Sequence, residues 1–147
     1  MARLPRKALP PQGIYHVTAR GVARCAIVLD DEDPRLFLGL LALEVRRERW
    51  VCYAFCLMPS HYHAILATTL NRLSRGLHRL NGVFAQTFNA RYRRTGHLFG
   101  DRFAAFVIRD EDHLRNATEY VLFSPVRAGI CSHPDEWPWS GASRRLS

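Results

Sequence analysis

The chain has 147 residues, of which 48% are hydrophobic and 23% are charged, values that exclude a disordered or collagen-like protein and favour a single domain over residues 1–147. No apolar run reaches the roughly 18 residues that span a bilayer, and the four cysteines include no CxxC pair. We therefore expect a cytoplasmic protein without a membrane segment. The net charge of +8 indicates a polyanionic partner.

The positive charge is concentrated in one part of the chain. Arginine supplies almost all of it, because Lys7 is the only lysine. Residues 70–109 contain eight arginines and a single acidic residue, Asp101, whereas an acidic cluster lies at residues 30–33. One side of the molecule should therefore be positive and contact nucleic-acid phosphates. The residues that we assign to DNA binding are Arg72, Arg75, Arg79, Arg91, Arg93, Arg94 and Arg102.

The first half of the chain predicts a strand, a helix and two more strands. Asp33 and Pro34 are typical of a helix start, with Asp33 as the capping residue, and apolar residues follow at helical spacing. Runs rich in β-branched and aromatic residues predict the strands. The elements in order are a basic, proline-bearing arm at 1–12, a strand at 13–20, a helix from 33 to about 49, and strands at 50–57 and 61–67.

The second half predicts two helices around one strand. Leucines and phenylalanines three and four residues apart make the helix at 71–89 the clearest in the chain. A strand at 102–109, a helix at about 110–123 and a tail at 124–147 follow, the last helix ending by Ser124 because Pro125 disfavours helical geometry before it. The order matches the ferredoxin-like β-α-β-β-α-β pattern. We therefore expect an α+β fold, an antiparallel sheet with helices on one face plus a C-terminal helix.

His61 and His63 are the first candidates for chemistry. Residues two apart on a strand point to the same side, so both imidazoles can bind one divalent metal while Tyr62 points away. Two ordinary, partly exposed histidines are the alternative. A zinc site that adds Cys52 and Cys56 is a further alternative, although their spacing of four within a strand is not the usual CxxC turn.

Tyr120 is the second candidate. It lies in the last predicted helix with Asn116 four residues before it and Ser124 four residues after it, so the three share one helical face if the helix extends that far. A tyrosine at such a position can belong to the core. It can also act as a covalent nucleophile if a nearby metal or cation stabilises the phenolate.

Five segments of the chain stand in an order that resembles one family. They are GIYHVTARG, AFCLMPSHYHAIL, RTGHLFGDRF, EYVLFSPVRAGI and DEWPWSGA, and together they extend over nearly the whole chain. They resemble the first strand, the HUH segment (histidine, bulky hydrophobic residue, histidine), the GHL-x-x-x-RF segment, the tyrosine segment and the tryptophan motif of the REP-associated tyrosine transposases. That family is a branch of the insertion-sequence-200-like transposases, which are single-tyrosine HUH enzymes.

The resemblance implies a role for each candidate residue. His61 and His63 would bind Mg²⁺ or Mn²⁺, which polarises the scissile phosphate, and Tyr120 would attack that phosphate to leave a 5′-phosphotyrosine and a free 3′-hydroxyl. Family members usually carry asparagine, a third metal ligand, at the position of Ser124, so Asn116 or a water could substitute here. The implied partner is single-stranded DNA or a hairpin of a repeated palindromic element. The sequence does not decide between monomer and homodimer.

Other classes of function stay open. An RNA-recognition module on the same fold would need neither metal nor covalent adduct, although the chain lacks an RNP-like aromatic stretch. A domesticated relative that binds DNA without transposing it is a second alternative, which Ser124 favours. A metal-dependent hydrolase would need a carboxylate base, and Glu119 is about 100° round the helix from Tyr120. Tyr92, Phe99 and Trp139 could stack on bases or belong to the core.

Overall fold

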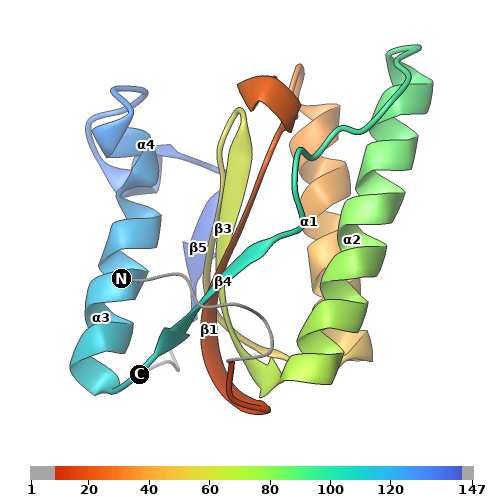
Figure 1. Ribbon diagram of the computed structural model, residues 1–147. Helices are drawn as coiled ribbons and strands as arrows, with labels where there is room; N and C mark the ends of the chain where they lie inside the picture. Colours follow the sequence, from red (N-terminus) through yellow and green to blue (C-terminus); the bar gives the residue numbers. More distant parts are fainter. Residues whose placement is uncertain (1–8, 144–147) are drawn as a thin grey trace.

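The computed structural model describes residues 9–143, which form one antiparallel sheet with helices on both faces (Figure 1). The strands are β1 (Gln12–Arg20), β2 (Val51–Leu57), β3 (His61–Thr69), β4 (Ala104–Ile108) and β5 (Ser140–Ala142). The helices are α1 (Glu32–Arg47), α2 (Leu70–Arg91), α3 (Glu111–Leu122) and α4 (Ser124–Arg127), with 3-10 turns at Val22–Arg24 and Pro134–Glu136. In this part of the chain no helix is both long and apolar enough to cross a bilayer.

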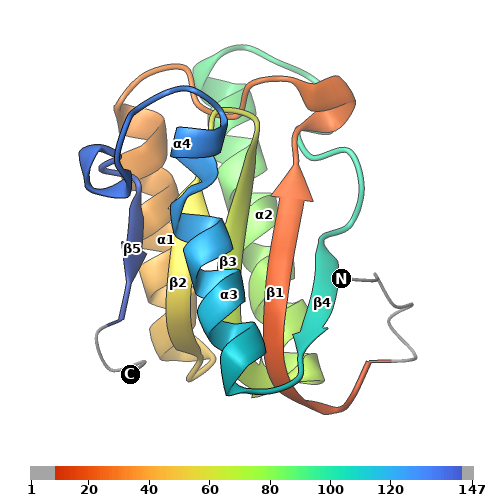
Figure 2. The ribbon, with the colours of Figure 1, turned by 90° about the vertical axis from the view of Figure 1, so that its left-hand side faces the viewer.

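The strands follow the order β4-β1-β3-β2-β5, and every neighbouring pair is antiparallel. The predicted ferredoxin-like order is therefore confirmed. Helices α1 and α2 cover one face of the sheet, and α3 and α4 lie on the other (Figures 1 and 2). The segment predicted as a tail contributes more than expected, because it supplies α4 and the edge strand β5 beside β2. Most of the predicted basic arm lies outside the described residues.

Alternation along the strands divides the sheet into an apolar face and a face that carries histidines. Tyr15 and Val17 of β1, with Tyr62 and Leu66 of β3, belong to the main core beneath α1 and α2 and are almost completely buried. The residues between them point to the α3 side, where a smaller apolar cluster leaves room for polar groups. His16 is one of these residues, so β1 contributes a titratable side chain to the α3 face.

A glycine sets the contact between α2 and the start of β2. The ring of Trp50 is 4% exposed, and its Nε1 donates a hydrogen bond to the backbone oxygen of Arg72 at 3.3 Å. A Cβ atom at Gly76 would overlap that ring. Glycine inside a helix costs about 1 kcal/mol relative to alanine, but here it is the residue that lets α2 approach so closely.

The start of α1 and the end of α3 are both predicted from the sequence, and the structure tests each prediction. Helix α1 begins after Asp31, and the prediction that Asp33 caps it is wrong. Asp33 is buried in the first turn, where its carboxylate accepts a hydrogen bond from the Leu29 N–H group instead of from the helix. Helix α3 ends at Leu122, before Ser124 as predicted, but Ser124 is itself helical as the first residue of α4, so the effect expected of Pro125 on the residue before it is not seen.

Candidate active site

His61 and His63 lie at the start of β3 on the face that α3 covers. His61 is paired in register with Arg20 of β1, and His63 with Thr18. Their ring centroids are 4.9 Å apart, and the rings are nearly perpendicular. Tyr62 points to the opposite face, as predicted, and donates a hydrogen bond to Asn81 at 2.6 Å. Strand alternation therefore brings the two imidazoles together.

Burial lowers the pKa of both histidines. The pKa of His63 falls to about 3, mainly through desolvation and secondly through the neighbouring rings of His16 and His61. The pKa of His61 falls to about 4, again through desolvation first and the positive charge of Arg20 second. Both rings are therefore neutral at pH 7, and each keeps a nitrogen lone pair. Neutral imidazole is the form that binds a metal.

A third histidine, which the sequence analysis missed, completes the cluster. Nε2 of His16 lies 3.0 Å from Nδ1 of His63 in hydrogen-bond contact, and the ring of His16 is only 4% exposed. Its Nδ1 atom is buried without a hydrogen-bond partner in the described structure. One signal was available: Tyr15, Val17 and Ala19 mark the apolar face of β1, which places His16 on the other face.

Tyr120 projects from α3 toward these histidines. Its ring centroid is 6.0 Å from that of His63 and 6.1 Å from that of His16, and the residue is 51% exposed. Arg127 of α4 covers one side of the ring, with its guanidinium carbon 3.8 Å from the centroid, a cation–π contact. The fold therefore brings the predicted nucleophile and a predicted metal ligand together. Arg20 and Arg127, the cations nearest this site, were not among the arginines predicted to act.

Ser124 holds α4 against the end of α3. Its hydroxyl donates to the backbone oxygen of Tyr120 at 3.2 Å and accepts from Nη2 of Arg127 at 3.1 Å, and the residue is 4% exposed. Asn116 is exposed one turn before Tyr120. Over residues 9–143, no group of three or more His, Cys, Asp and Glu side chains is arranged to hold a metal. Asn116 or Ser124 as a third ligand stays a prediction.

The alternative zinc site is not assembled. Cys56 is paired with His63, but Cys52 is paired with Leu66, and an irregularity at Tyr53 shifts the register between them. A bulge of this kind reverses the side to which the following residues point. The two thiols consequently lie on opposite faces, and burial raises the pKa of Cys52 to about 11 and that of Cys56 to about 12.

Two of the arginines assigned to DNA binding link α2 to α1. Arg75 binds Glu48 through two hydrogen bonds of 2.8 and 2.9 Å, and Arg79 binds both Glu44 and Glu48. The two glutamates are 4% and 3% exposed. Hydrogen bonds from Arg75, together with those from Arg79, hold the pKa of Glu48 at about 2. The arginine-rich side of α2 thus faces acids of α1, and much of its charge is neutralised within the protein.

The other five assigned arginines differ in their contacts. Arg72 donates to the backbone oxygen of Glu48, Arg91 pairs with Asp30 and Asp33, and Arg94 binds Asn89 and the backbone oxygen of His97. Arg93 and Arg102 are exposed and make no hydrogen bond or ion pair with other described residues. Arg93 and Arg102 are therefore the assigned residues whose charge is most available to a ligand.

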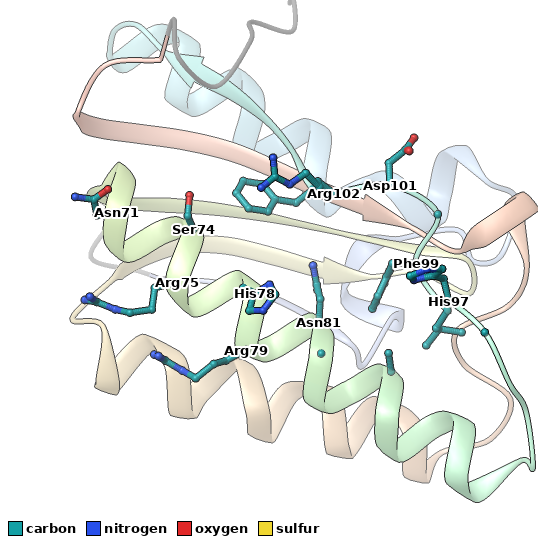
Figure 3. Close-up of a pocket in the computed structure, with 16 residues that line it drawn as sticks. Asn71, Ser74, Arg75, His78, Arg79, Asn81, His97, Phe99, Asp101 and Arg102 are labelled. Atoms are coloured by element: carbon teal, nitrogen blue, oxygen red, sulfur yellow. The ribbon is translucent and has the colours of Figure 1, made fainter.

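A groove of about 1110 Å³ lies between α2 and residues 96–103 (Figure 3). Arg102 stands on one wall, and His78 and Asn81 stand on the α2 wall. The Oδ1 atom of Asn81 accepts from Tyr62, which leaves its N–H groups free to donate. Asp101 is the one acidic residue among those that line the groove. The groove carries positive charge and lies on the side of α2, away from Tyr120.

The aromatic residues that could have stacked on bases are occupied elsewhere. Tyr92, Phe99 and Trp139 all pack against the main core. The hydroxyl of Tyr92 also donates to Asp33 at 2.7 Å. Their assignment to the core therefore holds in the free protein.

The fold and the site define a class: a ferredoxin-like α+β protein whose His-x-His strand faces a tyrosine on a helix. Comparisons with known proteins agree. A Haemophilus influenzae protein assigned as a REP-associated tyrosine transposase is 27% identical over 103 residues, which cover 62% of this chain. The chain spans 58% of that relative's length. No protein-family model matches the chain.

Solved structures share the fold. The structure of a REP-associated tyrosine transposase bound to a REP hairpin matches with a TM-score of 0.70, covering 95% of this chain and 82% of that chain at 18% identity. The crystal structure of a protein from Deinococcus radiodurans, described as a transposase, matches with a TM-score of 0.52 over 82% of this chain and 94% of that chain, at 15% identity. The resemblance to the REP-associated tyrosine transposases is thus confirmed as a similarity of sequence and of fold.

Proposed function

We propose that the protein is a single-tyrosine HUH transposase that cleaves and rejoins single-stranded or hairpin DNA. The observation that carries the proposal is the position of Tyr120, which is half exposed and 6.0 Å from His63 between ring centroids. Tyr15 and Tyr62, which serve the core, are almost completely buried. The similarity to a transposase from Haemophilus influenzae supports the same activity.

The reaction needs little more than the groups at this site. The phenolic oxygen of Tyr120 attacks a backbone phosphorus and loses its proton, while the bond from phosphorus to the 3′-oxygen breaks and that oxygen gains a proton. The products are a 5′-phosphotyrosine and a free 3′-hydroxyl. Arg127 retains guanidinium N–H groups beyond the one that binds Ser124, and these can contact the phosphate. Because one phosphoester replaces another, rejoining requires no ATP.

His61 and His63 fit a divalent metal. Nδ1 of His61 lies 3.4 Å from the hydroxyl of Ser60, and Nδ1 of His63 is bonded to His16. Each ring therefore has Nε2 left for a ligand. Mg²⁺ or Mn²⁺, when bound, would polarise the phosphate that Tyr120 attacks. Asn116, Ser124 or a water is the proposed third ligand.

DNA is the proposed partner because the neighbouring solved structure is bound to a REP hairpin. Arg102 in the groove and the exposed Arg93 are the residues best placed to contact phosphates, which position DNA without reading its sequence. The remaining assigned arginines contribute the N–H groups that their internal contacts leave free. A cytoplasmic location stays a prediction.

Labelled oligonucleotides test the covalent step. A pool of hairpins with randomised single-stranded flanks is labelled at the 3′ end in one sample and at the 5′ end in another, and each is incubated with protein and Mn²⁺ or with EDTA. We expect a labelled protein band on a denaturing gel only with the 3′ label and only with Mn²⁺. A band with the 5′ label would mean the opposite polarity of attack.

The double substitution His61→Ala with His63→Ala tests the metal role. It should abolish cleavage and leave hairpin binding nearly unchanged in a gel-shift assay, because the arginines remain. Continued cleavage would show that the metal assignment is wrong. Hairpin binding by the wild type without an adduct under any metal condition would favour the non-catalytic binding module, an alternative consistent with the hydroxyl of Ser124 being already engaged.

A further inference from the structure

The proposed function requires one particular assignment of donor and acceptor in the hydrogen bond between His16 and His63. Two neutral imidazoles share one proton across the 3.0 Å contact, and either ring can be the donor. If His16 donates, His63 carries its own proton on Nε2 and cannot bind a metal through that atom. If His63 donates from Nδ1, its Nε2 atom presents a lone pair.

The surroundings leave His16 as the partner that fixes this choice. The two residues are diagonal neighbours on one face of the antiparallel pair, because His16 is opposite Ile65 and His63 is opposite Thr18. Both rings are at least nine-tenths buried, and no carboxylate of the described residues bonds to either one. A metal-binding histidine normally donates its second ring N–H group to a hydrogen-bond acceptor, which orients the ring. Among the described residues, His16 is in the position of that acceptor for His63.

We propose that His16 is a positioning residue for metal binding, which accepts the Nδ1–H of His63 and so directs Nε2 of His63 toward a divalent metal. The inference rests on the proposed function, since it presumes that His63 is a ligand. In this arrangement His16 carries its own proton on Nδ1, which is buried without a hydrogen-bond partner in the described structure.

Substitutions separate positioning from packing and from direct ligation. His16→Gln keeps an amide oxygen near the position of Nε2, whereas His16→Phe keeps the ring but has no acceptor. Thr18→Val is the matched control, because Thr18 lies on β1 like His16, is opposite His63 of β3, and its hydroxyl makes no hydrogen bond with the described residues. Mn²⁺ affinity is measured without DNA by electron paramagnetic resonance of the free ion, and thermal unfolding of the apo protein reports folding.

We expect His16→Phe to weaken Mn²⁺ binding by about 10- to 100-fold, and His16→Gln and Thr18→Val to stay within about threefold of the wild type. An unchanged affinity in His16→Phe would overturn the proposal. Equal losses in the Phe and Gln variants, with both still folded, would also overturn it and indicate direct ligation by His16.

The covalent assay distinguishes this outcome from failure of the proposed function. A wild type that forms the Mn²⁺-dependent adduct while His16→Phe binds Mn²⁺ normally refutes only the positioning role. A wild type that neither binds Mn²⁺ nor forms the adduct refutes the proposed function, and the role of His16 with it.

Discussion

The two faces of the sheet treat polar side chains in opposite ways. Between α1 and α2, Arg75 and Arg79 bind buried glutamates, and each carboxylate has cationic partners. Beneath α3, His16 keeps an unpartnered nitrogen, and Tyr120 is half exposed beside His63. The α1–α2 face carries paired charges, whereas the α3 face carries neutral histidines beside a half-exposed tyrosine.

The number of arginines in a segment of the sequence is therefore a poor measure of the positive charge that is available to a ligand. Buried carboxylates that bind two arginines lower the free charge of α2, although they stabilise the contact between the helices. Polar groups that the fold leaves without partners are the more direct indication of a site.

Tyr120→Phe should have the largest effect. Removing one oxygen eliminates the nucleophile, so we expect adduct formation to fall by about 10⁴-fold or more, with hairpin binding unchanged. Denaturing gels with the 3′-labelled oligonucleotide measure it. Tyr53→Phe, at a partly buried tyrosine of β2, is the control and should keep full activity. An adduct that still forms in Tyr120→Phe would show that Tyr120 is not the nucleophile and that the α3 face is not the active site.

Acid should destabilise the histidine face before it affects the ion pairs. The folded-state pKa values of His16, His61 and His63 lie at about 4, 4 and 3, below the unfolded value of about 6.5, so the unfolded state binds more protons between these limits. The free energy of unfolding should therefore fall as the pH drops from about 6.5 to 4.5, by roughly 2 kcal/mol for each well-buried histidine. Urea unfolding across this range measures it.

The carboxylate of Glu48 should act in a lower pH range. Its folded-state pKa of about 2 is below its ordinary value, so the stability that it contributes is present above about pH 4.5 and is lost as the pH falls toward 2. The two pH ranges separate the histidines from Glu48. A free energy of unfolding that stays constant from pH 7 to 4.5 would contradict the histidine prediction, because it would show that these rings are not buried as neutral groups.

Glu48→Gln should destabilise the fold by about 1–3 kcal/mol, because it removes a buried carboxylate that accepts charged hydrogen bonds from Arg75 and Arg79. It should also raise DNA affinity, since Arg75 loses its acidic partner and Arg79 keeps only Glu44. Arg35→Gln disrupts only an exposed pair with Glu32 and should cost less than about 0.5 kcal/mol. Urea midpoints and gel shifts measure both effects. A loss of DNA affinity in a folded Glu48→Gln would contradict the neutralised-charge interpretation.

Arg102→Ala should change DNA binding, whereas Arg79→Ala should change the stability of the fold. Arg102 has no internal partner in the described structure, so its loss should weaken hairpin binding a few-fold and reduce the slope of log K against log salt by about 1. Arg79→Ala should lower stability and leave the salt slope nearly unchanged. Binding isotherms across a salt series measure the slopes. Equal slopes in the two variants would mean that internal pairing does not withhold Arg79 from DNA.

The sequence predicted what depends on local periodicity. Alternation located His61, Tyr62 and His63 correctly, and helical spacing located α2. These features depend on a few consecutive residues, so a single sequence contains them.

What the sequence could not reveal depends on alignment between distant elements. The contact of His16 with His63 requires the register of β1 against β3, and the pairing of Arg79 with Glu44 requires the relative position of two helices. The bulge at Tyr53 reverses the face to which the following side chains of β2 point, and no residue pattern in the segment predicts it.

The close approach at Gly76 has a consequence for engineering. Helix propensity recommends alanine in place of every helical glycine, for a gain of about 0.4–1 kcal/mol. At Gly76 that advice fails, because the Trp50 ring that a methyl group would strike is tied to the backbone of Arg72. At Gly39, on α1, a Cβ atom would meet nothing within 4 Å. A thermostable variant should therefore begin with Gly39→Ala, whereas at Gly76 the space beside Trp50 admits no side chain.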